Sequence, residues 1–166
     1  MGGCASVATG EIIVDGVWGR RGPNQLCIED SASRIPLGKL AFSVSRYGAV
    51  PTAELSHAGM YANRQATIFG GQAWGEAYGP VEMELDGRIV KEMPEEMIEA
   101  TIGKFAAAAA AAKQCGFGMV LIHAGHGWGL AQFLSPTVNT RKDRWGGPDL
   151  ENRMRLPLAV IESVPS

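Results

Sequence analysis

All three histidines of the chain fall where an apolar strand is expected to end. His57 follows the apolar segment 49–55, and His123 and His126 follow the segment 117–122. In α/β proteins with parallel strands, ligands bind at the carboxyl ends of the strands. A histidine there can donate a hydrogen bond to a developing oxyanion or exchange protons near neutral pH. The close spacing of His123 and His126 predicts two imidazoles that converge on one ligand oxygen.

Two other kinds of site compete for the same residues. Three histidines could hold Zn²⁺ with an open water position, as in zinc hydrolases, but no His-Glu-x-x-His pattern stands beside them. The segment 125–129 is a weak match to a dinucleotide fingerprint, because the third glycine would fall at Leu130. We also expect an irregular loop from Gln132, whereas the fingerprint needs a helix there. The sequence therefore favours oxyanion chemistry, with a zinc hydrolase as an alternative.

Composition limits the class of protein. The chain has 166 residues, with 15 Lys+Arg, 17 Asp+Glu and a formal net charge of −2, which gives no electrostatic footprint for nucleic acid or acidic membranes. The longest apolar stretch, 105–112, is far shorter than the ~20 residues of a membrane span, and the first residues lack the pattern of a signal peptide. Three widely spaced cysteines without a C-x-x-C pair are typical of reduced thiols. We expect a single domain over 1–166, cytoplasmic, that binds neither nucleic acid nor membranes.

Strands and helices are expected to alternate along the chain. The pattern predicts strands over 5–14, 49–55 and 117–123, a hairpin within 81–90, and helices over 37–47, 94–113 and 148–164. The first helix would pack through Leu37, Leu40, Ala41 and Val44, and the strand 117–123 would be buried on both faces. Asp86-Gly87 is a type I′ turn signal. This order predicts an α/β fold with a parallel sheet, either doubly wound or a (β/α)₈ barrel.

The sequence around the histidine pair carries a long and specific pattern. The runs Ile122-His-Ala-Gly-His-Gly-Trp-Gly-Leu-Ala-Gln-Phe-Leu-Ser-Pro-Thr137, Asn139-Thr-Arg-Lys-Asp-Arg-Trp-Gly-Gly147 and Glu151-Asn-Arg-Met-Arg155 closely resemble the old yellow enzyme family of NAD(P)H:flavin oxidoreductases. Segments 54–64 and 2–11 resemble the third and second strands of that family. The form is most like the branch of 2-enoate reductases and related ene-reductases. The resemblance implies FMN, NADH or NADPH as reductant, and a small-molecule substrate with an activated alkene, an enone or enoate.

The resemblance also implies roles for individual residues. His123 and His126 match the pair that hydrogen-bonds a substrate carbonyl or phenolate oxygen. Gly10, Glu54 and His57 would lie beside the cofactor, with Glu54 where the family commonly has a Gln that pairs with the flavin pyrimidine edge. Trp128 stands where the family has a proton-donating Tyr. Because an indole N–H is too weak an acid, solvent or another residue must supply that proton, or the substrate needs none.

The resemblance covers only the second to fourth strands of an eight-stranded barrel. A complete barrel takes about 250 residues, so we expect a truncated (β/α)₈ barrel with a small β-hairpin insertion. The flavin-phosphate site, and any iron–sulfur cluster, would belong to a missing C-terminal part. The alternative is a non-catalytic remnant that does not hold flavin. Open strand edges would favour self-association in either case.

Two groups of loop residues complete the expectations. Charged side chains after the fourth strand should organise structure rather than react, and aromatic side chains between 56 and 93 could cover the site. The charged group is Arg141, Asp143, Arg144, Glu151 and Arg153, and the aromatic group is Tyr61, Trp74 and Tyr78.

Overall fold

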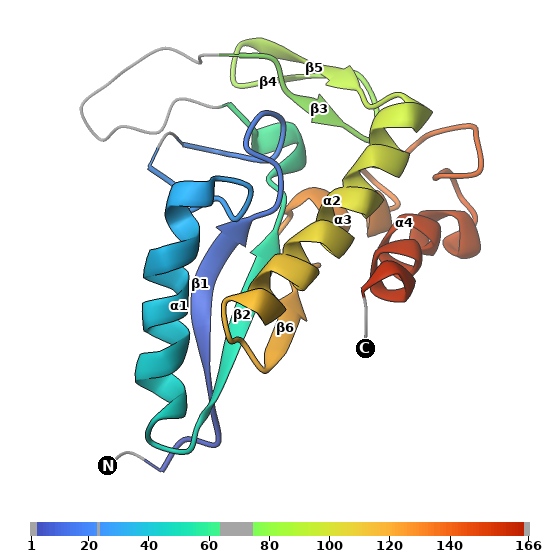
Figure 1. Ribbon diagram of the computed structural model, residues 1–166. Coiled ribbons are helices and arrows are strands. Elements are labelled where there is room, and N and C mark those ends of the chain that lie inside the picture. The colour runs from blue at the N-terminus through green and yellow to red at the C-terminus, as the bar shows by residue number, and fades with distance from the viewer. Residues whose placement is uncertain (1–2, 23, 64–74, 165–166) are drawn as a thin grey trace.

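Three parallel strands form the centre of the structure, in the order β1 (Ser6–Ile13), β2 (Val50–Ser56) and β6 (Met119–Ile122). The computed structural model describes residues 3–22, 24–63 and 75–164. Helix α1 (Ser31–Ser45) connects β1 to β2, and α2 (Glu95–Gln114) precedes β6. Figure 1 shows α2 crossing in front of β2 and β6. The chain thus contains two consecutive parallel βαβ units, as expected for part of a (β/α)₈ barrel.

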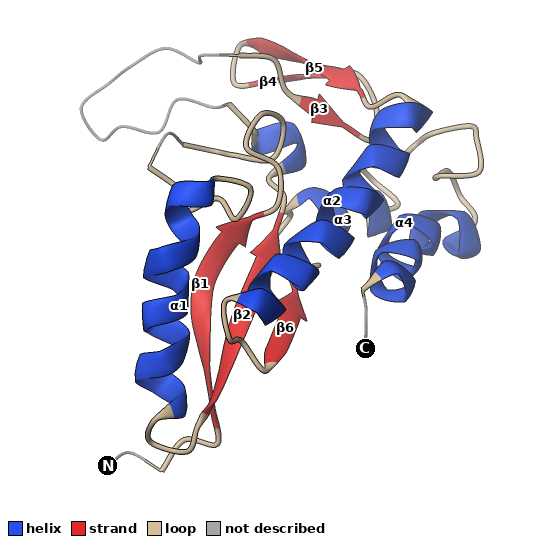
Figure 2. Cartoon of the chain, in the orientation of Figure 1, coloured by secondary structure: helices blue, strands red, loops and turns tan. Residues whose placement is uncertain are grey.

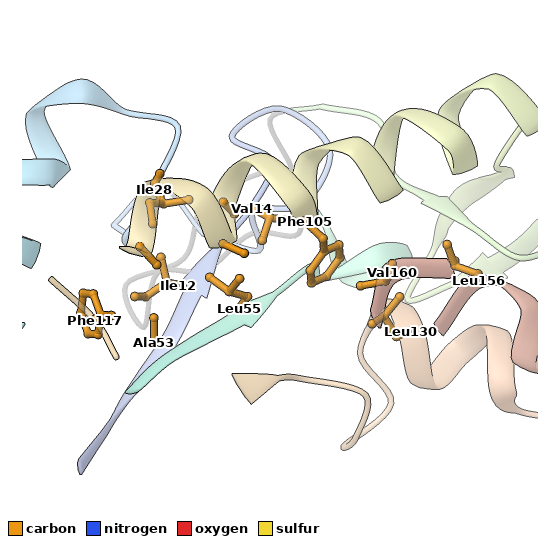
Figure 3. Packing of buried hydrophobic residues seen from close by; sticks show 14 of the residues in the cluster. Ile12, Val14, Ile28, Ala53, Leu55, Phe105, Phe117, Leu130, Leu156 and Val160 are labelled. Atoms are coloured by element: carbon orange, nitrogen blue, oxygen red, sulfur yellow. The ribbon is translucent and has the colours of Figure 1, made fainter. Parts of the chain in front are cut away.

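The main core lies between the sheet and α2. Ala53 and Leu55 of β2 are fully buried in one cluster with Phe105 of α2, and Figure 3 shows these side chains between the two elements. Side chains alternate across a strand, so Glu54 lies on the opposite face of the sheet. The alanine-rich part of α2 buries Ala108, Ala109, Ala111 and Ala112. Small side chains let the helix approach the sheet closely, so the seven-alanine run is explained by packing.

Helix α1 begins earlier than the apolar pattern predicts. It starts at Ser31 rather than at residue 37, because the residues of its first turns are mostly exposed and carry no apolar periodicity. Leu37 and Ala41 are 1% exposed, as expected. Leu40 is 43% exposed, so the prediction that it packs inward is wrong. The buried stripe of α1 is narrower than the sequence pattern indicated.

The predicted hairpin is present above the strand ends. Strands β4 (Met83–Leu85) and β5 (Arg88–Glu92) are antiparallel, and Figure 2 shows them as a small separate sheet. Asp86 and Gly87 have φ values of 52° and 75°, and positive φ at both central positions is what a type I′ turn requires. A short strand β3 (Tyr78–Gly79), which the sequence pattern did not predict, pairs with β5 in parallel.

Two helices follow β6. Helix α3 (Gly129–Leu134) replaces the irregular loop that was expected from Gln132, because Leu130 and Phe133 are buried on one face of this helical turn. Helix α4 (Leu150–Ser163) starts at the N-cap Asp149, whose side chain accepts the Glu151 N–H, and it contains Pro157. Among the residues that the structure describes, no helix is long and apolar enough to cross a membrane.

Strand β6 departs from the expected burial on both faces. Met119 and Leu121 are 52% and 47% exposed, whereas Val120 and Ile122 pack against the main core. Helix α2 covers only one face of β6, and the strand lies at the edge of the three-stranded sheet. The other face, which would line the interior of a closed barrel, is open in this chain.

Candidate active site

A bulge in β1 positions Gly10 and the backbone of Glu54. The register of β1 against β2 shifts between Ala8 and Glu11. At this point the Glu54 N–H donates to the Thr9 hydroxyl at 3.1 Å. A Cβ built on Gly10 would meet no atom within 4 Å, so the backbone borders open space. The register shift places Gly10 in a strand bulge, and its contact with a flavin stays a prediction.

The histidine pair lies at the carboxyl end of β6. The His123 N–H donates to the Leu55 carbonyl at 2.9 Å, which extends the pairing with β2. The rings of His123 and His126 stack with centroids 5.2 Å apart and an interplanar angle of 22°. His126 Nδ1 lies 3.4 Å from His123 Nε2. The two imidazoles therefore lie side by side, and their convergence on one ligand oxygen stays a prediction.

Glu54 and His123 form a short polar contact within the site. His123 Nδ1 lies 2.7 Å from Glu54 Oε1, and the two side chains are only 13% and 18% exposed. The resemblance placed both residues near a ligand but did not indicate that they bind each other. The strand register explains the contact. Leu55 of β2 pairs with Ile122 of β6, and because Glu54 precedes Leu55 and His123 follows Ile122, the two residues are diagonal neighbours across the strands.

A tight turn brings His126 back over His123. His126 has φ of 54°, in the left-handed region that non-glycine residues seldom adopt, and Gly127 follows with φ of 73°. The Trp128 N–H closes the turn on the Gly125 carbonyl at 3.0 Å. Strained backbone of this kind persists only where the surrounding structure holds it.

The side chain of Gln132 stabilises this turn through hydrogen bonds. Its side chain is 1% exposed, and its Nε2 donates to the Gly127 carbonyl at 2.7 Å and to the Ala58 carbonyl at 3.1 Å. Its Oε1 accepts the Met60 N–H at 2.9 Å. One amide thus ties the histidine turn to the short 3-10 helix η1 (Gly59–Tyr61). Sequence reasoning missed Gln132, because a polar residue in a presumed loop gives no signal of burial.

A pocket of about 250 Å³ opens beside the pair. Tyr61 and Trp128 meet edge to face in it, with centroids 6.4 Å apart. The Arg21 guanidinium carbon lies 6.0 Å from the centre of the Trp128 ring. The pocket is lined by Arg21, Tyr61, His126 and Trp128. An aromatic wall, a cation and an imidazole together suit a small planar ligand that carries an oxygen.

The expected aromatic cover is only partly present. Tyr61 lines the pocket, but Tyr78 instead packs edge to face against Trp18 at 5.1 Å. Trp74 lies outside the described residues. Arg21 was not singled out in the sequence, since a lone cation in a glycine-rich loop has no distinctive pattern.

His57 lies beneath the histidine turn rather than in the pocket. It is 3% exposed, and its Nδ1 accepts the Gly59 N–H at 3.0 Å. Its carbonyl accepts the Gly129 N–H at 2.8 Å. Its Nε2 is buried and has no hydrogen-bond partner among the described residues. His57 therefore supports the loop, and a contact with a cofactor stays a prediction.

The buried His57 should make folding stability depend on pH. Burial lowers the pKa of His57 to about 4, against the opposing attraction of Asp15 and with a smaller repulsion from Lys104. Between pH ~6.5 and ~4 the unfolded chain binds a proton that the folded chain does not, so stability falls as pH falls. The full loss from this group is about 3 kcal/mol, and it is complete below pH ~4.

Urea unfolding at several pH values tests this. His57→Asn keeps an acceptor for the Gly59 N–H but does not titrate, so its stability should fall less steeply over the same interval. All other titrating groups are shared by the two proteins. Parallel stability curves for the two proteins would contradict the prediction.

The structure does not gather the three histidines into a metal site. Within residues 3–22, 24–63 and 75–164, no group of three or more His, Cys, Asp or Glu side chains could hold a metal ion. His57 faces loop backbone, whereas His123 and His126 face each other and Glu54. The zinc alternative thus gains no support from the geometry.

The arginines after β6 organise the loops, as expected. Arg141 is 5% exposed and donates to the carbonyls of Pro80 and Met93 at 2.8 and 2.9 Å, which joins the segment after β3 to the segment before α2. Arg153 donates to the carbonyls of Gly147 and Pro148, both at 2.7 Å. These contacts use backbone acceptors and leave the side chains away from the pocket.

The residues at the strand ends fit the ring system of a flavin. FMN has a planar ring whose pyrimidine edge offers N–H and carbonyl groups. The open surface over Gly10 admits a flat ring. Glu54 uses Oε1 for His123, and its Oε2 accepts no hydrogen bond from the described residues, so it is available to an N–H donor.

The strand order, the parallel βαβ units and the site at the strand ends define part of a (β/α)₈ barrel. The whole chain, residues 1–166, matches the model of the NADH:flavin oxidoreductase / NADH oxidase family, and the chain belongs to this family.

Comparisons with individual proteins agree with the family. The chain is 36% identical over 146 residues to an NADPH dehydrogenase of Bacillus licheniformis, covering 88% of this chain and 41% of that protein. It is 38% identical over 164 residues to a metal reductase of Desulforamulus reducens, covering 98% of this chain and 23% of the relative. The structure of an Old Yellow Enzyme from Pichia sp. superposes with a TM-score of 0.82 at 28% identity, covering 95% of this chain and 42% of that one. The chain therefore spans less than half the length of these relatives.

Proposed function

We propose that this chain forms the substrate-facing part of an FMN-dependent oxidoreductase that uses NADH or NADPH to reduce an enone or enoate. The observation that carries the proposal is the array of Glu54, His123 and His126 at the strand ends, beside a pocket of about 250 Å³. Family membership supports the flavin and the nicotinamide reductant. The substrate class rests on the chemistry of the array.

The array suits a substrate oxygen that becomes negative during reaction. Bound FMN supplies hydride to the substrate. Hydrogen bonds from the histidine pair to a carbonyl oxygen draw charge from the β-carbon of the alkene and stabilise the enolate as it forms. Trp128 and Tyr61 form the wall of the pocket and exclude water from one side of the substrate. Trp128 cannot supply the proton for the α-carbon, because an indole N–H is not acidic enough.

The test is made on the native polypeptide that carries this chain. We expect visible flavin absorbance in the purified protein and oxidation of NADH or NADPH that depends on an added enone. A flavin-free protein without this activity would instead support the alternative of a non-catalytic remnant. Cytoplasmic location and the lack of nucleic-acid binding stay expectations from composition.

In the flavin-loaded protein, His126→Ala should lower kcat/KM by about 100-fold, close to 3 kcal/mol, the scale for loss of one oxyanion donor, because His126 is the imidazole that lines the pocket. Steady-state kinetics with one enone substrate measures this. Trp128→Phe is the comparison variant, and it should alter KM through pocket shape while leaving the pH dependence of turnover unchanged. An unchanged kcat/KM in His126→Ala, or a kinetic ionisation lost in Trp128→Phe, would overturn these roles.

A further inference from the structure

Glu54 decides which ring nitrogens of the pair carry protons. An ionised carboxylate can only accept hydrogen bonds, so the 2.7 Å contact with Glu54 Oε1 requires the proton of His123 on Nδ1. In the neutral ring, His123 Nε2 is then an acceptor. His126 Nδ1 lies 3.4 Å from this nitrogen and can donate to it when it carries the ring proton.

We propose that Glu54 is a positioning residue that fixes both neutral imidazoles as Nδ1–H tautomers, so that the neutral pair offers His126 Nε2 to the pocket as a hydrogen-bond acceptor. The resting site then takes a ligand with a hydroxyl donor, such as a phenol or an enol. To stabilise an oxyanion, the pair must first gain one proton. This inference rests on the proposed function only for the identity of the ligand site.

The neighbouring charges single out Glu54 for this role. Glu11 pairs with Glu54 in the strand register, but its Oε1 is held by the Gln25 side-chain amide at 2.5 Å. Arg21 reaches the pocket over the Trp128 ring rather than over Glu54. No other carboxylate among the described residues forms an ion pair with either histidine of the pair.

The backbone supports the same arrangement. The left-handed turn at His126 and Gly127 returns the second imidazole over the first, and Gln132 holds the Gly127 carbonyl. Glu54 is held from the other side by its N–H bond to Thr9. Both ends of the array are therefore fixed by hydrogen bonds that involve the main chain. These contacts hold the strained turn in place, so the two imidazoles keep one relative position.

His57 provides an internal contrast within the same chain. Its Nδ1 accepts the Gly59 N–H, so its proton must lie on Nε2. With three histidines in the sequence, the neutral protein should show two Nδ1–H rings and one Nε2–H ring. A histidine in water has no partner that enforces Nδ1–H.

Solid-state ¹⁵N NMR of the ¹⁵N-histidine-labelled 166-residue chain tests this, because it reads tautomers at any state of association. The measurement is made at about pH 8, above the ordinary imidazole range. We expect the two-to-one pattern, with the Nε2–H signals lost in His57→Asn. Three Nε2–H rings in the wild-type spectrum would overturn the proposal without any variant of Glu54.

Two further measurements examine the cause and the ligand. Glu54→Ala should convert His123 to the Nε2–H form, whereas Glu11→Ala, the matched carboxylate on the adjacent strand, should leave the pattern intact. Added phenol should shift the His126 Nε2 signal, and anisole, which lacks the donor, should not. An unchanged tautomer in Glu54→Ala, or equal shifts or no shift with the two ligands, would count against the proposal. None of these measurements requires bound flavin. They therefore test the tautomers independently of the proposed enzymatic function.

Discussion

Replacing Gln132 by leucine is expected to lower the free energy of unfolding by about 2 kcal/mol. Leucine has a similar volume but cannot accept the Met60 N–H or donate to the Gly127 carbonyl, whereas the Ala58 carbonyl keeps the Tyr61 N–H at 3.2 Å. Met60 is buried, so water does not replace its lost acceptor, while the exposed Gly127 can bind water instead. Each buried polar group left unpaired costs about 1–3 kcal/mol. The loss is a large part of the total stability of a domain of this size.

Urea unfolding followed by tryptophan fluorescence, at one protein concentration, measures the effect. Gln114→Leu is the matched control, since Gln114 lies at the exposed end of α2 and makes only a long contact with Arg34 at 3.5 Å. Its effect should stay within about 0.5 kcal/mol. A Gln132→Leu protein that loses less than about 1 kcal/mol would show that the Gln132 amide is not the clamp of the histidine turn.

The strands and the longest helix were predictable because their signals are local. Apolar runs bounded by glycine marked β1, β2 and β6, and Pro94 with two glutamates marked the start of α2. The predicted start of helix α1 is too late in the sequence. Its first turns are mostly exposed, so they carry no apolar stripe that the sequence could show. Helix α3 was missed because its six residues are too few to show a period.

The same distinction between local and tertiary signals applies to the residues of the candidate site. The proximity of His123 and His126 follows from a short spacing on one loop, and it was predictable. The bond between Glu54 and His123 joins two strands far apart in sequence, and only the register of β2 against β6 brings them together. Gln132 and Arg21 act through tertiary contacts, with the Gly127 carbonyl and the Trp128 ring. Such contacts leave no local pattern in the chain.

The 166-residue polypeptide on its own should self-associate. The sheet order leaves β1 and β6 each with one strand partner among the described residues, so both present unpaired backbone groups. The uncovered face adds Met119 and Leu121, which are 52% and 47% exposed. A closed barrel has no edges and packs this face inside. Edges and apolar surface together favour pairing with further copies of the chain.

Size-exclusion chromatography with light scattering decides the matter. We expect oligomers or aggregates and weak FMN binding in a flavin titration. Met119→Lys places a charge on the open face and should shift the population toward monomer, because inward-facing lysines on edge strands oppose pairing. Ile35→Lys on α1, where Ile35 is 70% exposed and distant from the strand edges in sequence, should not. A monodisperse wild-type species of 17.6 kDa that binds one FMN at micromolar concentration would show that the open strands need no partner.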